Sequence, residues 1–384
     1  MKVRLFKGEF LNSWGIAERC TAAGTGALNI FSAVLMDAGS DEPILRSSDI
    51  KRSVIVKTQG LEVIEPGSAV LPVKRVSDLF SKIRGDEMTL EVKEGTATLT
   101  AGKSRYRFST YPAEDFPALP SAANGTPLFT IQSGELVRAL EYGSLCADLK
   151  QSYPEYLSAV YFDKQTILNT VSTDKRRVAI YQAEVDAGDA EDSPLLQVAG
   201  IRDLQKFFGM SKTDFTVTIS SDDSQVYFVG DKIEFSIRKT ISKFPAYTKQ
   251  MSRAFPVRAM IDRGELMAAL ECIGIVVREY SNMVKIAFNG NECSLSGQAA
   301  EFGDAHEIVK CEYAGDPLTA YFNVRFMQEG IKACEGPNVT LAFDEDCHMM
   351  RIESSSSGKF IYILAPVDAG DGDSGNEQEV PQEA

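Results

Sequence analysis

Histidine is almost absent from this sequence. The 384 residues include only His306 and His348, and neither lies beside a nucleophile motif. Histidine performs much of the acid–base catalysis near neutral pH, so its scarcity argues against an enzyme. The seven cysteines are scattered, odd in number and without a Cys-x-x-Cys pair, which is typical of a reducing cytoplasm and argues against zinc. We therefore predict no catalytic residues, no metal and no cofactor.

Long apolar runs are also missing. No stretch approaches the ~18 consecutive apolar residues of a membrane span, and the N-terminus alternates apolar and basic residues as a strand does. The only Gly-x-Gly-x-x-Gly match, Gly370–Gly375, lies in an acidic segment whose aspartates would repel phosphate. We expect a cytoplasmic protein without membrane contact. An enzyme with dispersed carboxylates remains an alternative, and it would require a bound metal ion.

The sequence does contain a repeat. The segment 131–141, an apolar piece followed by Gly-Glu and a helical pattern, recurs at 261–271 and more faintly around Gly8 and Glu9. A spacing of about 130 residues is that of whole domains. We predict three tandem domains, at 1–125, 126–252 and 253–367. The acidic tail that follows, 368–384, contains no aromatic residue and is expected to be disordered.

Each repeat has two helical patterns and about six to eight strand patterns. The first helices are expected at 9–20, 134–145 and 264–276, and the helices midway through each repeat at 73–83, 200–208 and 323–334. Strand patterns include 28–36, 52–65, 157–162, 225–230, 233–238 and 360–364. Helices packed against antiparallel sheets would bury both apolar faces. The predicted fold class is α+β.

The formal charge of −14 argues at first against a nucleic-acid partner, but its distribution is uneven. The tail alone carries six acidic residues and no basic one. The midway helices and their flanks carry nine basic residues against three acidic ones. Solvated surface lysines and arginines explain any one such helix. Three equivalent helices with the same bias predict a repeated basic surface that attracts a polyanion without reading its sequence.

Several motifs then resemble one family. They are the segment 111–120 (YPAEDFPALP), 171–180 (VSTDKRRVAI), 243–247 (KFPAY) and 322–326 (FNVRF), in this order around the threefold repeat. With these motifs in this order, residues 1–367 resemble the beta subunit of bacterial DNA polymerase III, the beta sliding clamp. The resemblance implies a head-to-tail homodimer whose six domains close a ring around double-stranded DNA.

The resemblance also implies a pocket between the second and third domains. In the family this pocket takes a short linear motif from DNA polymerase III, the clamp loader and repair factors, and such an apolar cleft suits an extended peptide. The pocket residues expected here are Leu157, Thr173, Lys175, Arg176, Arg177, Val178, Pro245, Ile363, Leu364, Ala365, Pro366 and Val367.

Two further sets of residues follow from the resemblance and the charge pattern. For the dimer interface they are Tyr106 and Phe108 against Ile275 and Val276. For DNA they are Lys74, Arg75, Lys82, Lys150, Gln151, Tyr156, Arg202, Lys206, Arg325 and Lys332. An arginine that the family often carries in a loop of the first domain corresponds to Thr25 here, so we predict no DNA contact from that loop.

The chain departs from the family at the pocket. Lys175-Arg176 replaces a Gly-His pair, and Ala365 and Val367 replace larger methionines. Asp368 stands where a basic residue is usual. We hypothesise that the acidic tail screens or competes at the pocket. The main alternative to a processivity clamp is a diverged, clamp-like scaffold that binds protein partners without a role in replication.

Overall fold

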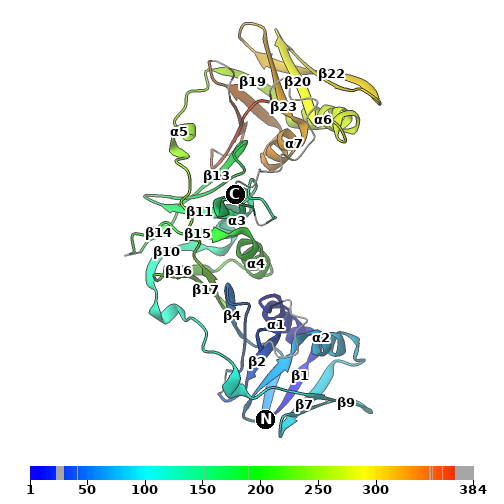
Figure 1. Cartoon of the computed structure of the whole chain (residues 1–384), viewed down its shortest axis with the longest axis vertical. Coiled ribbons are helices and arrows are strands. Elements are labelled where there is room, and N and C mark those ends of the chain that lie inside the picture. The colour runs from blue at the N-terminus through cyan, green and yellow to red at the C-terminus, as the bar shows by residue number, and fades with distance from the viewer. Residues whose placement is uncertain are drawn as a thin grey trace, which may run out of the picture. The chain divides into compact units, whose positions relative to one another are not determined.

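The computed structural model describes residues 1–22, 30–40, 42–150, 152–188, 190–345, 347, 349–356 and 358–367 (Figure 1). It divides into two compact units. The first unit comprises residues 1–140, 162–167 and 184–241, and the second comprises 141–161, 168–183 and 242–367. The division falls within helix α3 and strand β11.

The first unit contains two sheets with helices packed against them. Its helices are α1 (Lys7–Arg19), α2 (Val73–Lys82), most of α3 (Ser133–Gly143) and α4 (Val198–Gly209). Its strands are β1 (Lys2–Phe6), β2 (Ala33–Asp37), β3 (Ile44–Ser48), β4 (Arg52–Lys57), β5 (Leu61–Glu65), β6 (Ser68–Pro72), β7 (Glu87–Lys93), β8 (Thr96–Ala101), β9 (Ser104–Ser109), β10 (Thr126–Gln132), β14 (Asp186–Ala187), β15 (Leu195–Gln197), β16 (Thr216–Ser221), β17 (Gln225–Gly230) and β18 (Ile233–Arg238). The sheet orders are β5-β1-β7-β8-β9 and β14-β10-β16-β17-β18-β4-β3-β2-β6.

The second unit is built in the same way. Its helices are α5 (Thr248–Met251), α6 (Arg263–Val277) and α7 (Val324–Ala333). Its strands are β11 (Ala159–Lys164), β12 (Leu168–Thr173), β13 (Arg177–Ala183), β19 (Val257–Asp262), β20 (Met283–Asn289), β21 (Glu292–Ala299), β22 (Gly303–Tyr313), β23 (Leu318–Asn323), β24 (Asn338–Phe343), β25 (Met350–Ser354) and β26 (Phe360–Leu364). These strands follow the order β11-β12-β13-β26-β25-β24-β19-β22-β21-β20-β23.

The predicted α+β class is confirmed by the described residues, in which helices pack on antiparallel sheets. In the first unit, α1 and α2 lie side by side (Figure 1). Between them the rings of Phe10 and Trp14 each meet Phe80 edge-on, at centroid distances of 5.2 and 5.0 Å. These three side chains are fully buried and form the centre of one core. Aromatic rings bury a large apolar area and favour this edge-to-face geometry.

Two of the sheets continue from one repeat of the sequence into the next. In the first unit β18 pairs with β4, and Phe235 lies opposite Val54. In the second unit β26 pairs with β13, and Tyr362 lies opposite Ala179. Each of these joins pairs the last strand of one repeat with the strand that follows a tight hairpin in the other repeat. The chain therefore contains two joins of the same design.

Several local expectations were wrong in detail. The pattern at 52–65 forms two strands rather than one, because the chain turns at Gly60. Gly60 has a φ of +62°, and a Cβ there would lie 2.8 Å from the carbonyl oxygen of Phe6, so only glycine fits. In the pattern at 28–36 the strand covers only Ala33–Asp37, and 30–32 form a 3₁₀ turn. Strands β3 and β6 were not predicted.

Candidate functional site

The site is built on the turn between β12 and β13. Asp174 organises this turn, because its carboxylate accepts hydrogen bonds from the backbone N–H groups of Arg176 and Arg177, both at 3.0 Å. The hydroxyl of Thr173 donates to the carbonyl of Arg177 at 2.8 Å and accepts from the N–H of Lys175 at 3.1 Å. Lys175 adopts a φ of +75°. The turn thus presents Lys175 and Arg176 to solvent, and both are exposed.

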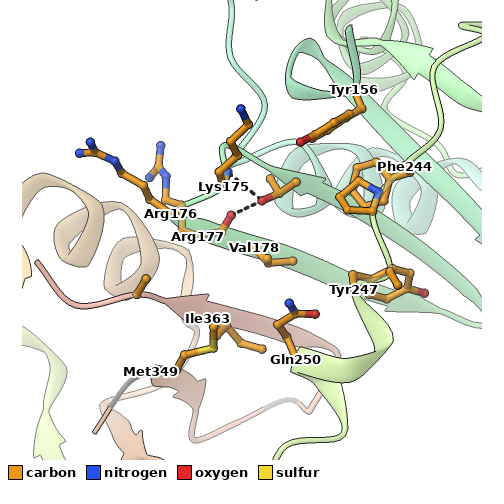
Figure 2. Close-up of a pocket in the computed structure, with 14 residues that line it drawn as sticks. Tyr156, Lys175, Arg176, Arg177, Val178, Phe244, Tyr247, Gln250, Met349 and Ile363 are labelled. Carbon is orange, nitrogen blue, oxygen red and sulfur yellow. Dashed lines mark hydrogen bonds between the residues drawn. The ribbon is translucent and has the colours of Figure 1, made fainter. Parts of the chain in front are cut away.

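A cavity of about 220 Å³ lies beside this turn. Its aliphatic part comes from Val178 on β13, Ile363 on β26 and Met349, and Val178 and Ile363 are paired across the two strands. Figure 2 shows Lys175 and Arg176 on the opposite side of the cavity from Phe244 and Tyr247. Among the described residues, the cavity is lined by Tyr156, Thr173, Lys175, Arg176, Arg177, Val178, Phe244, Pro245, Ala246, Tyr247, Gln250, Met349, Ile363 and Ala365.

Stacked aromatic rings form the other wall. Phe244 lies parallel to Tyr161, with ring centroids 5.1 Å apart, and meets Tyr156 and Tyr247 edge-on. Phe244 and Tyr247 are buried, and Pro245 and Ala246 between them are exposed. An aliphatic floor, an aromatic wall and a polar turn make a cleft suited to apolar side chains of an extended peptide.

Arg177 has a different role from its two neighbours. It is only 7% exposed, and its guanidinium pairs with Asp174 at 2.8 Å and with Glu329 of α7. It also donates to the Tyr362 hydroxyl at 2.9 Å and lies 3.9 Å from the centre of the Phe326 ring. Burial alone would lower the pKa of Arg177, but the surrounding groups, Glu329 included, raise it overall. Arg177 therefore holds β13 to α7, which leaves Lys175 and Arg176 as the available cations.

The structure brings most of the expected pocket residues together. Those that line the cavity are Thr173, Lys175, Arg176, Arg177, Val178, Pro245, Ile363 and Ala365. The other four do not line it: Leu157 and Leu364 are buried, while Pro366 and Val367 lie just past the end of β26. Leu364 faces away because alternate residues of a strand point to opposite sides, and Ile363 already faces the cavity.

Among the described residues, five more line the cavity that the sequence does not predict, namely Phe244, Ala246, Tyr247, Gln250 and Met349. Phe244, Ala246 and Tyr247 belong to the motif 243–247 that carries the family resemblance, so the sequence does contain a signal for these three. Tyr156 was assigned to DNA, whereas its ring lies in the pocket wall, 6.0 Å from Phe244. Met349 follows a loop far along the chain, and nothing in its local sequence marks it.

Seven of the other nine expected DNA residues lie on helices. Lys74, Arg75 and Lys82 on α2, Arg202 and Lys206 on α4, and Arg325 and Lys332 on α7 are all exposed. Arg325 pairs with Glu329 at 3.2 Å, so part of its charge is already neutralised. Lys150 is exposed in the segment before the 3₁₀ turn at 155–158. Gln151 and Thr25 lie outside the described residues.

The expected interface residues lie on an edge strand and on a helix. Tyr106 and Phe108 are half-buried on β9, the last strand of its sheet. Ile275 and Val276 lie near the end of α6, and Ile275 is 65% exposed. Tyr106 and Phe108 on β9 and Ile275 on α6 therefore leave apolar area accessible to a partner surface.

Across the described residues, no three His, Cys, Asp or Glu side chains are grouped so that they could hold a metal ion. In the same part of the chain, no helix is both long and apolar enough to cross a membrane.

Comparisons with known proteins agree on one family. Residues 1–120 match the N-terminal domain of the DNA polymerase III beta subunit, and 253–368 match its C-terminal domain. The chain is 26% identical to the beta sliding clamp of Synechococcus elongatus over 338 residues, covering 86% of this chain and 89% of that protein. It is 22% identical to the Escherichia coli beta sliding clamp over 346 residues, covering 90% and 93%.

Solved structures agree on the fold. The DNA polymerase III beta subunit of Thermotoga maritima matches with a TM-score of 0.86 at 20% identity, covering 95% of this chain and 99% of that one. The beta subunit of Streptococcus pyogenes matches with a TM-score of 0.88 at 20% identity, covering 96% and 100%. The chain belongs to the DNA polymerase III beta subunit family, the beta sliding clamps.

Proposed function

We propose that this sliding clamp is a head-to-tail homodimer whose ring encircles double-stranded DNA and tethers DNA polymerase III and other factors to it, working by binding rather than catalysis, in the cytoplasm. The observation that best supports the ring is the repeated strand pairing between repeats, of β4 with β18 and of β13 with β26. A third join of this design would need a strand edge from the first repeat and one from the third. The three domains at 1–125, 126–252 and 253–367 are part of this proposal.

The first edge is β9. The β8–β9 hairpin has a two-residue turn, as does the β17–β18 hairpin, so Tyr106 corresponds to Phe235 of β18. Phe235 and its counterpart Tyr362 lie in the two internal joins. Tyr106 is thus equivalent in position to the aromatic residues that lie at the two internal joins. Within the described residues β9 pairs only with β8, so its other edge is open.

The second edge is β22. It pairs with β21 along Gly303–Lys310, while on its other side only Cys311–Tyr313 pair, with β19. In the described residues this leaves the backbone groups of 303–310 open on one side. An open strand edge pairs readily with another strand. Phe302 and Ile308, 64% and 58% exposed, add apolar area there.

The two edges also carry opposite charges. Exposed Arg105 and Arg107 lie on β9, and exposed Lys103 lies in the turn before it. At the other edge, exposed Glu301 precedes β22, while exposed Asp304 and half-buried Glu307 lie on that strand. Opposite charges steer two surfaces together and disfavour β9 against β9 or β22 against β22. This complementarity supports a head-to-tail arrangement of two copies.

The exposed basic residues of α2, α4 and α7 support sequence-independent DNA contact. Lysine and arginine bind phosphates through counterion release, which tolerates sliding because no base is read. The pocket at Thr173–Val178 and Phe244–Tyr247 supports recruitment of partners, including the clamp loader and repair factors, through a short linear motif. A scaffold without a role in replication is not favoured by the family match.

Sedimentation velocity together with retention on circular DNA tests this function. We expect a species of about twice the 42.0 kDa chain mass, and we expect loaded protein to stay on closed circular DNA and leave after linearisation. Equal loss from circular and linear DNA would contradict encirclement. A monomer at every accessible concentration would contradict the homodimer.

A further inference from the structure

We propose that the acidic segment 368–384 of this chain binds the basic turn at Lys175 and Arg176 and competes there with partner peptides. The inference rests on the proposed peptide pocket and adds a regulatory occupant to it. The proposed occupant is the chain's own C-terminal segment, because its charge is opposite to that of the turn and residues 363–367 run beside the turn.

The turn holds two cations that nothing else in the described structure engages. Arg177 uses its charge on Asp174 and Glu329. Asp174 is occupied by Arg177 and by two backbone N–H groups. Within the described residues, the side chains of Lys175 and Arg176 make no ion pair and are exposed. The rim of the pocket therefore keeps two positive charges next to an apolar cleft.

The described chain passes this turn just before the acidic segment begins. Ile363 and Ala365 line the pocket, and the N–H of Ala365 donates to the carbonyl of Arg176 at 2.8 Å. Two residues later, the N–H of Val367 donates to the carbonyl of Tyr321 at 2.8 Å. Asp368 follows directly. The backbone is thus hydrogen-bonded to one of the two cationic residues only three residues before the first tail carboxylate.

Sequence and length suit this occupant. Residues 368–384 contain Asp368, Asp371, Asp373, Glu377, Glu379 and Glu383, and no lysine, arginine or histidine. Seventeen residues span at most about 60 Å when fully extended, at ~3.5 Å per residue, so every carboxylate can reach a turn that the chain has just passed. A covalently attached segment acts at an effective concentration of about millimolar, which makes even weak attraction effective.

The segment would occupy the rim more than the floor. It contains no aromatic residue and little apolar area, so it cannot fill the space between Ile363 and Phe244. Its binding is therefore mainly electrostatic and weakens with salt, since the Debye length falls from about 10 Å at 0.1 M to about 3 Å at 1 M. A partner peptide with apolar side chains would also contact the aliphatic floor, and it would therefore displace the acidic segment.

The test compares full-length protein, protein ending at Val367, and a full-length variant in which the six tail acids are changed to Asn or Gln. The probe is a fluorescein-labelled hexapeptide, Gly-Leu-Ser-Leu-Phe-Gly, whose leucine and phenylalanine side chains match the floor and the aromatic wall. At 50 mM NaCl we expect the truncated and neutralised proteins to bind the probe about three- to tenfold more tightly than full-length protein. At 500 mM NaCl the three affinities should converge.

A second measurement uses a labelled synthetic peptide of residues 368–384 in trans. It should bind the truncated protein at low salt, and the Lys175→Ser/Arg176→Ser variant should lose that binding, whereas Lys285→Ser, at an exposed position on β20, should not.

Equal probe affinities for full-length and truncated protein at low salt would overturn the inference while leaving the pocket intact. Inhibition that survives neutralisation of the six acids would overturn its electrostatic basis. Failure of every form to bind the probe would count against the proposed peptide pocket, and the trans measurement would still decide whether the segment binds the turn.

Discussion

The guanidinium of Arg177 on β13 pairs with the carboxylate of Glu329 on α7, across the join between the second and third repeats. The same arrangement holds the other join, where Arg52 on β4 pairs with Asp203 on α4. In both joins an acid three residues earlier, Asp174 or Asp49, also pairs with the arginine. The two joins therefore share an ionic design as well as a strand pairing.

The repeat predicts where a third join would differ. Asp203 and Glu329 are each the sixth residue of their helix, and the sixth residue of α2 is Asp78. No lysine or arginine occurs in the turn between β21 and β22. A join between two copies would thus retain the acid and lack the arginine. The two joins within one chain therefore carry an ionic contact that the proposed join between copies would lack.

The Arg52–Asp203 pair should contribute substantially to stability. Arg52→Met would leave Asp203, which is only 5% exposed, with Arg19 alone as a cationic partner at 3.2 Å. Breaking a buried pair by removing one partner costs about 3–5 kcal/mol. We expect the free energy of unfolding to fall by about 3 kcal/mol, because Arg19 still pairs with Asp203. Urea unfolding measures the change. The double variant Arg52→Met/Asp203→Leu should recover most of the loss; a single-variant loss under about 1 kcal/mol would contradict the assignment.

The charged edges should govern dimerisation. Arg105→Glu/Arg107→Glu places like charges against the acidic edge of β22, so it should shift the protein toward monomer in sedimentation velocity. The matched variant Glu301→Lys/Asp304→Lys should do the same alone. Mixing the two variants should restore heterodimers, and dimers in each variant by itself would rule out this pairing of edges.

Phe244 should dominate peptide binding. Its ring stacks on Tyr161 and forms part of the pocket wall, so Phe244→Ala opens that wall. Truncating an aromatic anchor at an interface commonly weakens the binding free energy by about 2 kcal/mol or more, which corresponds to about 30-fold in affinity. Fluorescence anisotropy with a labelled partner peptide measures the loss. Tyr280→Ala removes an aromatic residue that does not line the pocket and should leave affinity unchanged.

The basic helices should set the salt dependence of DNA association. Arg202→Ser/Lys206→Ser removes two cations from α4, and each lost phosphate contact lowers the slope of log K against log salt by about 0.9. We expect weaker non-specific DNA binding with the dimer unchanged. Lys57→Ser serves as the control, because Lys57 is exposed on β4 and pairs with Glu42. Equal salt slopes for the helix variant and the parent protein would remove α4 from the DNA-contacting surface.

Thiol reactivity should report on the interface. Burial raises the pKa of Cys20 and of Cys146 well above the usual range, so both should resist a thiol reagent in the folded protein. Cys272 is exposed and lies three residues before Ile275 on α6, on the same side of the helix. It should react quickly in the Arg105→Glu/Arg107→Glu variant and more slowly in the dimer. Identical rates in the two proteins would place α6 outside the interface.

Local sequence patterns were enough to predict the repeat, the α+β class and many of the helices and strands. Strands β17, β18 and β26 begin and end where the pattern predicted, because alternating apolar residues between tight turns specify a strand locally. The midway helices were also predicted to within about two residues, because Val76 and Phe80 of α2 and their equivalents repeat at helical spacing. Motif order also allowed the family to be recognised.

Only the three-dimensional structure reveals which segments distant in the sequence pack against one another. Strand β3 escaped prediction because Ser47 and Ser48 interrupt its apolar pattern, yet both are buried, and Ser47 donates to the carbonyl of Ala17 at 2.6 Å. The pairing of Val178 with Ile363, and of Arg177 with Glu329, joins residues more than 150 positions apart. Local patterns report which side of an element is apolar, whereas the partner of that side depends on how distant segments pack together.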